Sequence, residues 1–508
     1  MTVARTWAVA LVGVDGAVVE VEADLSKQTP EFRIIGLADR ALAEAVQRVH
    51  NACENSLLPL PRRRLTVNLS PASLPKQGSS FDVAIAIAAL ATETSMDAAS
   101  VAATAHIGEL GLDGRLRPVP GVLPAVLAAA REGIQRVVVP HANAAEAALV
   151  EGIEVLGAVC LAEVARWHGA DVEVPDLAPV PGRGADRRDD DPVDLSDIVG
   201  QREAVEALIV AASGGHHLMM SGPPGAGKTM LARRLPGILP PLDDRAALTA
   251  ASIRSLGGEP VEVLSRTPPF EAPHHGASVA ALVGGGSRGV RPGAIARASE
   301  GVLFLDEAGE FPGAVLDALR QPLESGSIEI HRVGHRTTFP ARFQLVLATN
   351  PCPCGNYGVR GAVCSCPPMA IRRYLGRVSG PLLDRIDIEL AMTRVTVAHV
   401  DTPTRAVSTA QARERVASAR ERAAYRLRDT PWRVNAHVPG EWLRRGPHAP
   451  DPATRRPLDE ALHRGTLTLR GFDRVLRVAH SIADLEGASR LALEHVGRAL
   501  YLKKGLTA

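Results

Sequence analysis

The sequence predicts an α/β protein with a helical C-terminal part. Residues 1–175 alternate short β-like segments with alanine-rich helical stretches, and residues 195–392 repeat this alternation, which favours a parallel sheet covered by helices. From residue 393 onward the apolar spacing is that of helices, so 393–508 is expected to be a helical domain. Residues 176–194 combine proline, glycine and charge without an apolar period, which is typical of a linker.

Composition sets the class of protein. A chain of 508 residues is long enough for about three domains, and 46% apolar residues suffice to build their cores. The net charge is +1, so a polyanionic partner would have to meet local basic clusters. No apolar run fits a signal peptide or a membrane span, and six cysteines do not make a disulfide scaffold. We expect a cytoplasmic protein with no membrane contact.

A phosphate-binding loop is the most specific motif in the chain. The string G-P-P-G-A-G-K-T follows an apolar stretch that fits a buried strand and runs into a helical segment. Its backbone N–H groups would close around phosphates at the positive end of that helix. Lys228 is expected to reach the β- and γ-phosphates and the Thr229 hydroxyl to bind Mg²⁺. The alternative is a chance glycine-rich loop. The motif consists of Gly222, Pro223, Pro224, Gly225, Ala226, Gly227, Lys228 and Thr229.

Two further apolar strands end in polar residues suited to ATP hydrolysis. After V-L-F-L, Asp306 is placed to hold Mg²⁺ and Glu307 to polarise the attacking water; the alternative is an acidic helix cap. After F-Q-L-V-L-A-T, Asn350 would orient that water; the alternative is an ordinary turn at a strand end. Together these residues predict an ATPase that uses ATP and Mg²⁺.

An arginine in the apolar string G-P-L-L-D-R-I-D-I is a further catalytic candidate. An unpaired guanidinium would be costly there, so Arg385 needs an anionic partner. The γ-phosphate of a neighbouring subunit's ATP fits, because such arginines raise the rate by about 10³–10⁵. The alternative is an ion pair within the chain, to Asp384 or Asp387.

The order of these motifs resembles that of an AAA+ ATPase. D-I-V-G-Q precedes the phosphate loop, and L-D-E, A-T-N, L-L-D-R and L-R-G follow it. The strings A-P-H-H-G-A-S-V-A-A-L-V-G-G-G-S, N-P-C-P-C-G, Y-L-G-R-V-S-G-P-L-L-D-R-I-D and R-V-L-R-V-A-H-S-I-A-D-L are similar to those of a narrower family, the magnesium-chelatase-like ComM (competence protein M) ATPases. The resemblance runs from near Val3 to Leu502.

This resemblance implies an AAA+ P-loop core followed by a helical lid, assembled into a hexameric ring with ATP sites between neighbouring subunits. Members are associated with DNA helicase activity and branch migration during natural transformation, which implies an ATP-dependent DNA translocase of DNA recombination. By match to the family motifs, Arg385 would act in trans and Arg470 would be the second sensor on the lid. Arg474, one helical turn further, is the fallback for that role.

Basic loops are the candidates for contact with branched or single-stranded DNA. Residues 284–293 are expected to form a flexible loop and residues 327–339 a hairpin. Similar hairpins in related rings point into the pore, where arginines would meet phosphates without reading bases; the alternative is exposed hairpin charge. The four candidates are Arg288, Arg291, Arg332 and Arg336.

A second basic region covers residues 405–446, with ten arginines against four acidic residues. Much of it is a predicted helix with Glu/Arg spacings, so a solvated helix face is the alternative to a DNA surface. Aromatic residues are only 3% of the chain, which favours tracking of the DNA backbone over base stacking.

Four cysteines form the pattern C-x-C-x₉-C-x-C directly after Asn350. Thiolates at this density suit a tetrahedral structural Zn²⁺, although C-x-C is tighter than the usual spacing. Metal-free reduced thiols are the alternative, and a disulfide does not fit a reducing compartment. The four are Cys352, Cys354, Cys364 and Cys366.

The N-terminal part contains a string, residues 75–90, that resembles the active-site segment of Lon-type proteolytic domains, with Ser80 at the position of the serine. Those enzymes use a lysine some forty residues later, and Pro124 stands at that place here. A serine without an adjacent base is a poor nucleophile, and Lys76 is too close in sequence to be the usual partner. We expect a Lon-like α/β domain without peptidase chemistry, used for assembly or DNA contact.

Two other functions stay open at this point. A motor subunit for metal insertion into a porphyrin would share the ATPase core, but its partner subunits carry an adhesion domain and no D-x-S-x-S string occurs here. An ATP-dependent protease is disfavoured by Pro124. Stimulation of the ATPase by DNA would distinguish the translocase from both.

Overall fold

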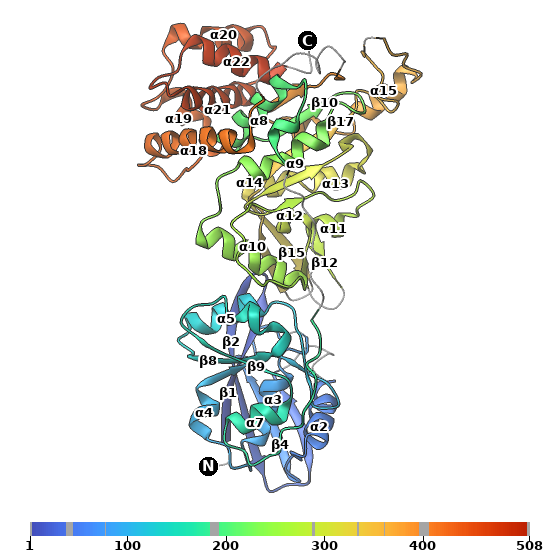
Figure 1. Cartoon of the computed structure of the whole chain (residues 1–508), viewed down its shortest axis with the longest axis vertical. Coiled ribbons are helices and arrows are strands. Elements are labelled where there is room, and N and C mark those ends of the chain that lie inside the picture. Colours follow the sequence, from blue (N-terminus) through green and yellow to red (C-terminus); the bar gives the residue numbers. More distant parts are fainter. Residues whose placement is uncertain are drawn as a thin grey trace.

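The structure, a computed structural model, describes residues 3–36, 44–76, 78–182, 193–286, 290–332, 335–359, 361–395 and 406–504. The molecule is elongated (Figure 1). The N-terminal strands and helices form one end, a second α/β layer occupies the middle, and the C-terminal helices cap the other end. Among the described residues, none of the helices is long and apolar enough to cross a membrane.

The N-terminal part is built on a mixed seven-stranded sheet of order β3-β4-β2-β1-β5-β8-β9. The long hairpin β1–β2 is antiparallel, and β1, β5, β8 and β9 run parallel. Helix α3 (Asp82–Leu90) is buried along its whole length, which explains its continuous apolar sequence. The strands are β1 (Val3–Val12), β2 (Asp15–Ser26), β3 (Glu31–Ile35), β4 (Arg64–Ser70), β5 (Thr104–His106), β6 (Glu109–Leu110), β7 (Leu116–Arg117), β8 (Arg136–Pro140) and β9 (Glu154–Ala158). The other helices are α2 (Ala45–Asn55), α4 (Ala98–Ala102), α5 (Val122–Arg131), α6 (Ala144–Ala147) and α7 (Leu161–Trp167).

The middle part is a five-stranded sheet of order β11-β14-β17-β10-β18, in which every neighbouring pair is parallel. Its strands therefore all end at one edge, called here the carboxyl edge, and begin at the opposite, amino edge. The strands are β10 (Leu218–Ser221), β11 (Phe270–Glu271), β14 (Val302–Leu305), β17 (Gln344–Thr349) and β18 (Ile388–Ala391). The helices are α8 (Arg202–Gly214), α9 (Lys228–Ile238), α10 (Asp244–Gly257), α11 (Val279–Val283), α12 (Ala294–Arg297), α13 (Gly313–Asp317), α14 (Arg320–Ser325), α15 (Pro368–Leu375) and α16 (Gly380–Leu383).

Two small antiparallel pairs extend from this sheet, and one confirms the predicted hairpin. Strands β15 (Ser327–Arg332) and β16 (His335–Pro340) pair along their whole length. The expected flexible loop at 284–293 is partly wrong, because its two ends pair as β12 (Gly284–Gly285) and β13 (Arg291–Pro292). Both pairs lie on the side that faces the N-terminal part (Figure 1).

The C-terminal helices form a cap that shares its apolar core with the middle sheet. Buried residues of α18 and α21 belong to the same cluster as those of α8 and α9. The predicted fold class is thus confirmed: mixed α/β, with a parallel core sheet and a helical C-terminal region. The helices are α18 (Thr409–Arg426), α19 (Gly440–Arg445), α20 (Pro452–His463), α21 (Leu469–Glu486) and α22 (Leu493–Lys504).

The N-terminal part packs against helix α10 and strand β16. The N–H of Gly121 donates to the carbonyl of Ser255 at 3.0 Å, and Ala251 and Val261 share a buried cluster with α5. At the turn between β1 and β2, Gly13 has φ of +68°, and a Cβ there would lie 2.4 Å from the Thr338 carbonyl. A glycine is needed at this close approach.

Candidate active site

The phosphate loop lies at the carboxyl edge, between β10 and α9. Gly225 and Gly227 have φ of +78° and +86°, the left-handed region that glycine adopts without strain, and helix α9 begins at Lys228. Gln201 anchors the loop, because its Nε2 donates to the carbonyls of Ala226 (3.2 Å) and Thr393 (2.6 Å). Sequence analysis used the D-I-V-G-Q string only for motif order and missed this contact.

Lys228 and Asn350 lie together, as the sequence predicts for residues of one site. The Lys228 ammonium donates to Asn350 Oδ1 at 3.0 Å and to the carbonyls of Gly222 (2.6 Å) and Pro223 (3.1 Å). Burial lowers the pKa of Lys228, and the nearby Asp306 carboxylate opposes that shift. The arrangement holds a cationic group inside the loop, where phosphate oxygens would bind.

Thr229 and Asp306 are also brought together, at the end of β14. The Thr229 hydroxyl donates to Asp306 Oδ2 at 2.7 Å. In an octahedral Mg²⁺ shell with bonds of about 2.0–2.1 Å, adjacent oxygens lie about 2.9 Å apart. The two oxygens therefore fit neighbouring positions around one Mg²⁺ ion.

Glu307 has a strained backbone and an unexpected partner. Its φ of +53° and ψ of 46° lie in the left-handed region, which is uncommon outside glycine and often marks a functional site. Its Oε2 lies 3.2 Å from Nδ1 of His275, whose ring lies 4.0 Å from that of His274. His275 belongs to the A-P-H-H-G string, which sequence analysis used only for the resemblance.

Arg385 lies at the amino edge, away from the phosphate loop of its own chain. It precedes β18 by three residues, and Asp387 between them donates its N–H to the His217 carbonyl just before β10. The four residues of β10 at about 3.3 Å each separate this edge from the loop by about 13 Å.

The partner of Arg385 differs from both intrachain candidates. Its Nη2 pairs with Glu324, whose side chain is 65% exposed, so the intrachain ion pair is present but with a different partner from the two alternatives, Asp384 and Asp387. Within the described residues its buried Nε has no hydrogen-bond partner. Its Nη1 donates to the Pro381 carbonyl at 2.5 Å, so the guanidinium is held by one backbone carbonyl and one exposed carboxylate.

Arg470 and Arg474 lie beside Arg385 at the same edge. Arg474 Nη1 donates to the Arg385 carbonyl (2.9 Å) and to Asp387 Oδ1 (2.5 Å), whereas Arg470 is exposed and lies 3.9 Å from Asp384. Burial acts to raise the pKa of Asp387, but Arg474 and His216 outweigh it and hold that pKa well below its usual range. All three arginines line one cavity of about 910 Å³.

The candidate DNA residues are only partly described. Arg291 is exposed in β13, and Arg336 is exposed in β16, where it pairs with Glu329. Arg332 ends β15, but its side chain is not described, and Arg288 lies outside the described residues.

The arginine-rich helix α18 is neither the DNA surface nor the solvated face that the sequence suggests. Its arginines mostly bind their own chain: Arg415 pairs with Glu206, Arg420 donates to the Ala212 carbonyl and Arg426 pairs with Asp484. The helix packs its buried face on α8 and α21, so these guanidinium groups stabilise the cap and offer little free charge.

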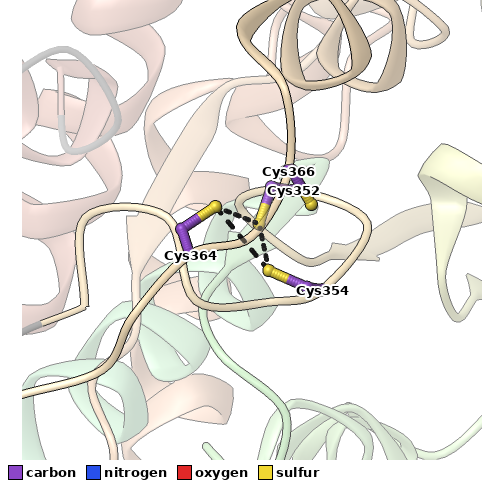
Figure 2. A group of neighbouring side chains, drawn as sticks. All are labelled: Cys352, Cys354, Cys364 and Cys366. Atoms are coloured by element: carbon purple, nitrogen blue, oxygen red, sulfur yellow. Dashed lines mark hydrogen bonds between the residues drawn. The ribbon is translucent and has the colours of Figure 1, made fainter.

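The four cysteines converge on one point (Figure 2). Sγ of Cys352 lies 3.4 Å from that of Cys354 and 3.7 Å from that of Cys364, and all four sulfurs lie within 4.8 Å of one another. Four Zn–S bonds of about 2.3 Å in a tetrahedron place sulfurs about 3.8 Å apart, so the donor set fits Zn²⁺. The N–H of Asn356 lowers the pKa of the Cys354 thiol to about 6.

The lysine nearest in sequence to the Lon-like Ser80 is held by backbone carbonyls. Lys76 donates to the carbonyls of Pro71 (2.5 Å) and Leu74 (3.1 Å), so its ammonium is engaged by backbone oxygens. Pro124 lies buried inside α5. That this domain lacks peptidase chemistry stays a prediction.

Comparison with known proteins gives matches along nearly the whole chain. Three family descriptions match: Subunit ChlI of Mg-chelatase over 21–143, Magnesium chelatase, subunit ChlI over 194–400, and Magnesium chelatase, subunit ChlI C-terminal over 406–503. An uncharacterized protein of Mycobacterium tuberculosis is 47% identical over 507 residues, 99% of each chain. Competence protein ComM of Haemophilus influenzae is 40% identical over 503 residues, 98% of this chain and 97% of the relative. The protein YifB of Escherichia coli is 38% identical over 498 residues, 97% and 95% of the two chains.

Proposed function

Because this chain belongs to the ComM/YifB family of magnesium-chelatase-like AAA+ ATPases, we propose that it is an ATP-dependent DNA translocase of the branch-migration type. The observation that carries the proposal is the match to a competence protein over nearly the full length of both chains, combined with an intact set of hydrolytic residues. Competence is the capacity to take up DNA, so DNA recombination is the process in which we place the protein.

The roles proposed at the carboxyl edge follow from the contacts there. The loop N–H groups and Lys228 bind the phosphates, and Asn350 orients the attacking water beside Lys228. Thr229 and Asp306 hold Mg²⁺, which when bound neutralises charge on the phosphate oxygens. Glu307 polarises the water once its carboxylate leaves His275.

Arg385, Arg470 and Arg474 are proposed to act on the ATP of a neighbouring subunit. An arginine side chain is too short to cross about 13 Å of sheet, so arginines at the amino edge contact either the ATP bound to a second copy of the chain or no nucleotide. Arg385, whose Nη2 meets the exposed Glu324 carboxylate, is the finger, and exposed Arg470 is the second sensor. Subunits joined in this head-to-tail way close into a ring, for which we propose six copies.

DNA contact is proposed for the two basic extensions of the middle sheet. Arg291 is exposed there, and Arg336 is 61% exposed although it pairs with Glu329. Arg288 and Arg332 belong to the same two segments. Contacts of this kind neutralise phosphates without reading sequence, so binding would weaken steeply with salt. The self-bound arginines of α18 are not included.

A structural Zn²⁺ is proposed at the four cysteines. The support is geometric, because the sulfur separations of 3.4 to 3.7 Å are close to those of a tetrahedral Zn–S₄ centre. All six cysteines of the chain are free of disulfides, so the four thiols are available to a metal.

ATPase assays with forked DNA test the function. The rate should rise several-fold with forked or single-stranded DNA at 50 mM salt and lose most of that stimulation at 200 mM, as counterions compete for the phosphates. Displacement of a labelled strand from the fork should require hydrolysis and be absent in Glu307→Gln. No response to any DNA would refute the proposal, and stimulation by tetrapyrrole-binding partners alone would favour a chelatase motor.

A further inference from the structure

The cysteine segment, described over residues 352–359 and 361–366, lies between Asn350 of the nucleotide site and helix α15. It begins two residues after Asn350, the partner of Lys228, and it leads into helix α15. Tyr374 of α15 packs on the loop that follows Glu307, because a Cβ on Gly309 would lie 2.5 Å from Tyr374 Cζ. Both flanks of the cysteine segment are therefore fixed to the carboxyl edge.

The segment also contacts the phosphate loop directly. Gly355, next to Cys354, is buried with φ of +77°, and a Cβ on it would lie 2.4 Å from Cδ of Pro224. The N–H of Gly355 donates to the Cys352 carbonyl at 2.9 Å and closes a turn that carries Cys352 and Cys354. Through Gly355, this turn packs on Pro224 of the phosphate loop. No side chain at position 355 fits against the Pro224 ring.

Little apolar packing holds this segment in place. Val363 is 89% exposed and Tyr357 is 52% exposed, and Asn356 bridges the two limbs only by a 3.3 Å hydrogen bond to the Val363 carbonyl. The four sulfurs, two from each limb, are the principal point at which the limbs meet (Figure 2). A loop without its own core needs a metal or another crosslink to keep one conformation.

We propose that Zn²⁺ bound by the four cysteines is a structural part of the nucleotide site: it fixes the cysteine segment against Pro224 and thereby holds the phosphate loop and Asn350 in the ATP-binding arrangement. The proposal rests on the zinc site proposed above, and it is independent of DNA translocation. Metal binding closes the loop, the closed loop supports the phosphate loop, and ATP affinity therefore depends on the metal.

The test measures zinc content and nucleotide affinity of the full-length protein without DNA. Cys364→Ser should lose about one equivalent of zinc, by mass spectrometry of the metal, and should bind a fluorescent ATP analogue at least tenfold more weakly. Retained circular dichroism would show that the variant folds. Because zinc loss and misfolding can coincide, a second variant leaves the cysteines intact.

Gly355→Ala supplies that variant. This variant should keep its zinc, yet its affinity for the ATP analogue should fall about fivefold to tenfold, because the new methyl group pushes the segment off Pro224. Gly358→Ala is the matched control: it lies in the same segment at φ of +72°, and nothing lies within 4 Å of its Cβ position. It carries the same backbone strain but should bind the analogue like the wild type.

Each outcome bears on the proposal. Wild-type protein purified without zinc, and unchanged in nucleotide affinity when zinc is added, would overturn it. Normal affinity in both Cys364→Ser and Gly355→Ala would also overturn it, even with zinc bound in the wild type. Failure of DNA to stimulate the ATPase would contradict the proposed translocase while leaving these results unaffected.

Discussion

Substitution of Arg385 by alanine tests whether two chains build one ATP site. Arg385 lies at the amino edge of the core sheet, and strand β10, about 13 Å long, separates this edge from the phosphate loop of its own chain. Arg385→Ala should leave binding of an ATP analogue within about twofold of wild type while turnover falls on the order of 10³, the lower range for such arginines. The assay is phosphate release at saturating ATP and DNA.

Mixing this variant with Lys228→Ala gives a quantitative expectation. A working interface then needs Lys228 from an Arg385→Ala chain and Arg385 from its Lys228→Ala neighbour. With equal amounts and random assembly, about a quarter of the interfaces meet this condition. Turnover should therefore recover to about a quarter of the wild-type rate, whereas each variant alone stays near background.

The control replaces the Lys228→Ala partner with a chain that carries both substitutions. That mixture contains no intact Arg385, so no rescue is expected. A rate near background in the first mixture, measured after exchange of subunits has been verified, would refute the trans arrangement and leave the Glu324 pair as the only role of Arg385.

Three further substitutions follow from the site geometry. Glu307→Gln should bind ATP normally and hydrolyse it about 10²–10⁴ times more slowly in single-turnover assays, and an unchanged rate would assign the water to another residue. His275→Ala should raise the ATPase rate without DNA by up to about fivefold, because it removes the contact that holds Glu307. Fivefold corresponds to about 1 kcal/mol, the size of an exposed ion pair. His274→Ala should not change the rate, because the side chain of His274 packs on His275 and does not contact Glu307. Asp387→Ala should lower the free energy of unfolding in urea at pH 7 by about 3–5 kcal/mol, because it leaves Arg474 buried without its carboxylate. Folding lowers the pKa of Asp387, so its carboxylate stabilises the folded state above the pKa of about 4 in the unfolded chain, and this stabilisation is lost as pH falls. The difference in free energy of unfolding between wild type and Asp387→Ala should therefore shrink toward acid pH. A difference that stays constant with pH would contradict this account.

The residues that meet at the carboxyl edge of the core sheet could be predicted from the sequence, for a physical reason. Parallel strands end together, so polar residues that follow apolar strands must converge, as Asp306 does with Thr229 and Asn350 with Lys228. The hairpin β15–β16 and the helical cap were predictable from local periodicity for the same kind of reason.

Contacts between segments distant in sequence were not predictable. Neither spacing nor composition indicates that His275 meets Glu307, or that Arg385 pairs with Glu324 rather than with its neighbours in sequence. The arginines of α18 look like a surface charge pattern, and only the packing of that helix on α8 turns Arg415 toward Glu206.

The docking of the N-terminal part on α10 has a practical consequence for anyone who shortens the chain. Ala251 and Val261 are buried in a cluster shared with α5, and Leu248 and Leu264 pack at its margin. Removal of residues 3–182 would expose this covered apolar face on the remaining fragment, and exposed apolar patches of this kind promote aggregation. A fragment that stays in solution would therefore need polar replacements at Leu248 and Leu264, or would have to keep the N-terminal part.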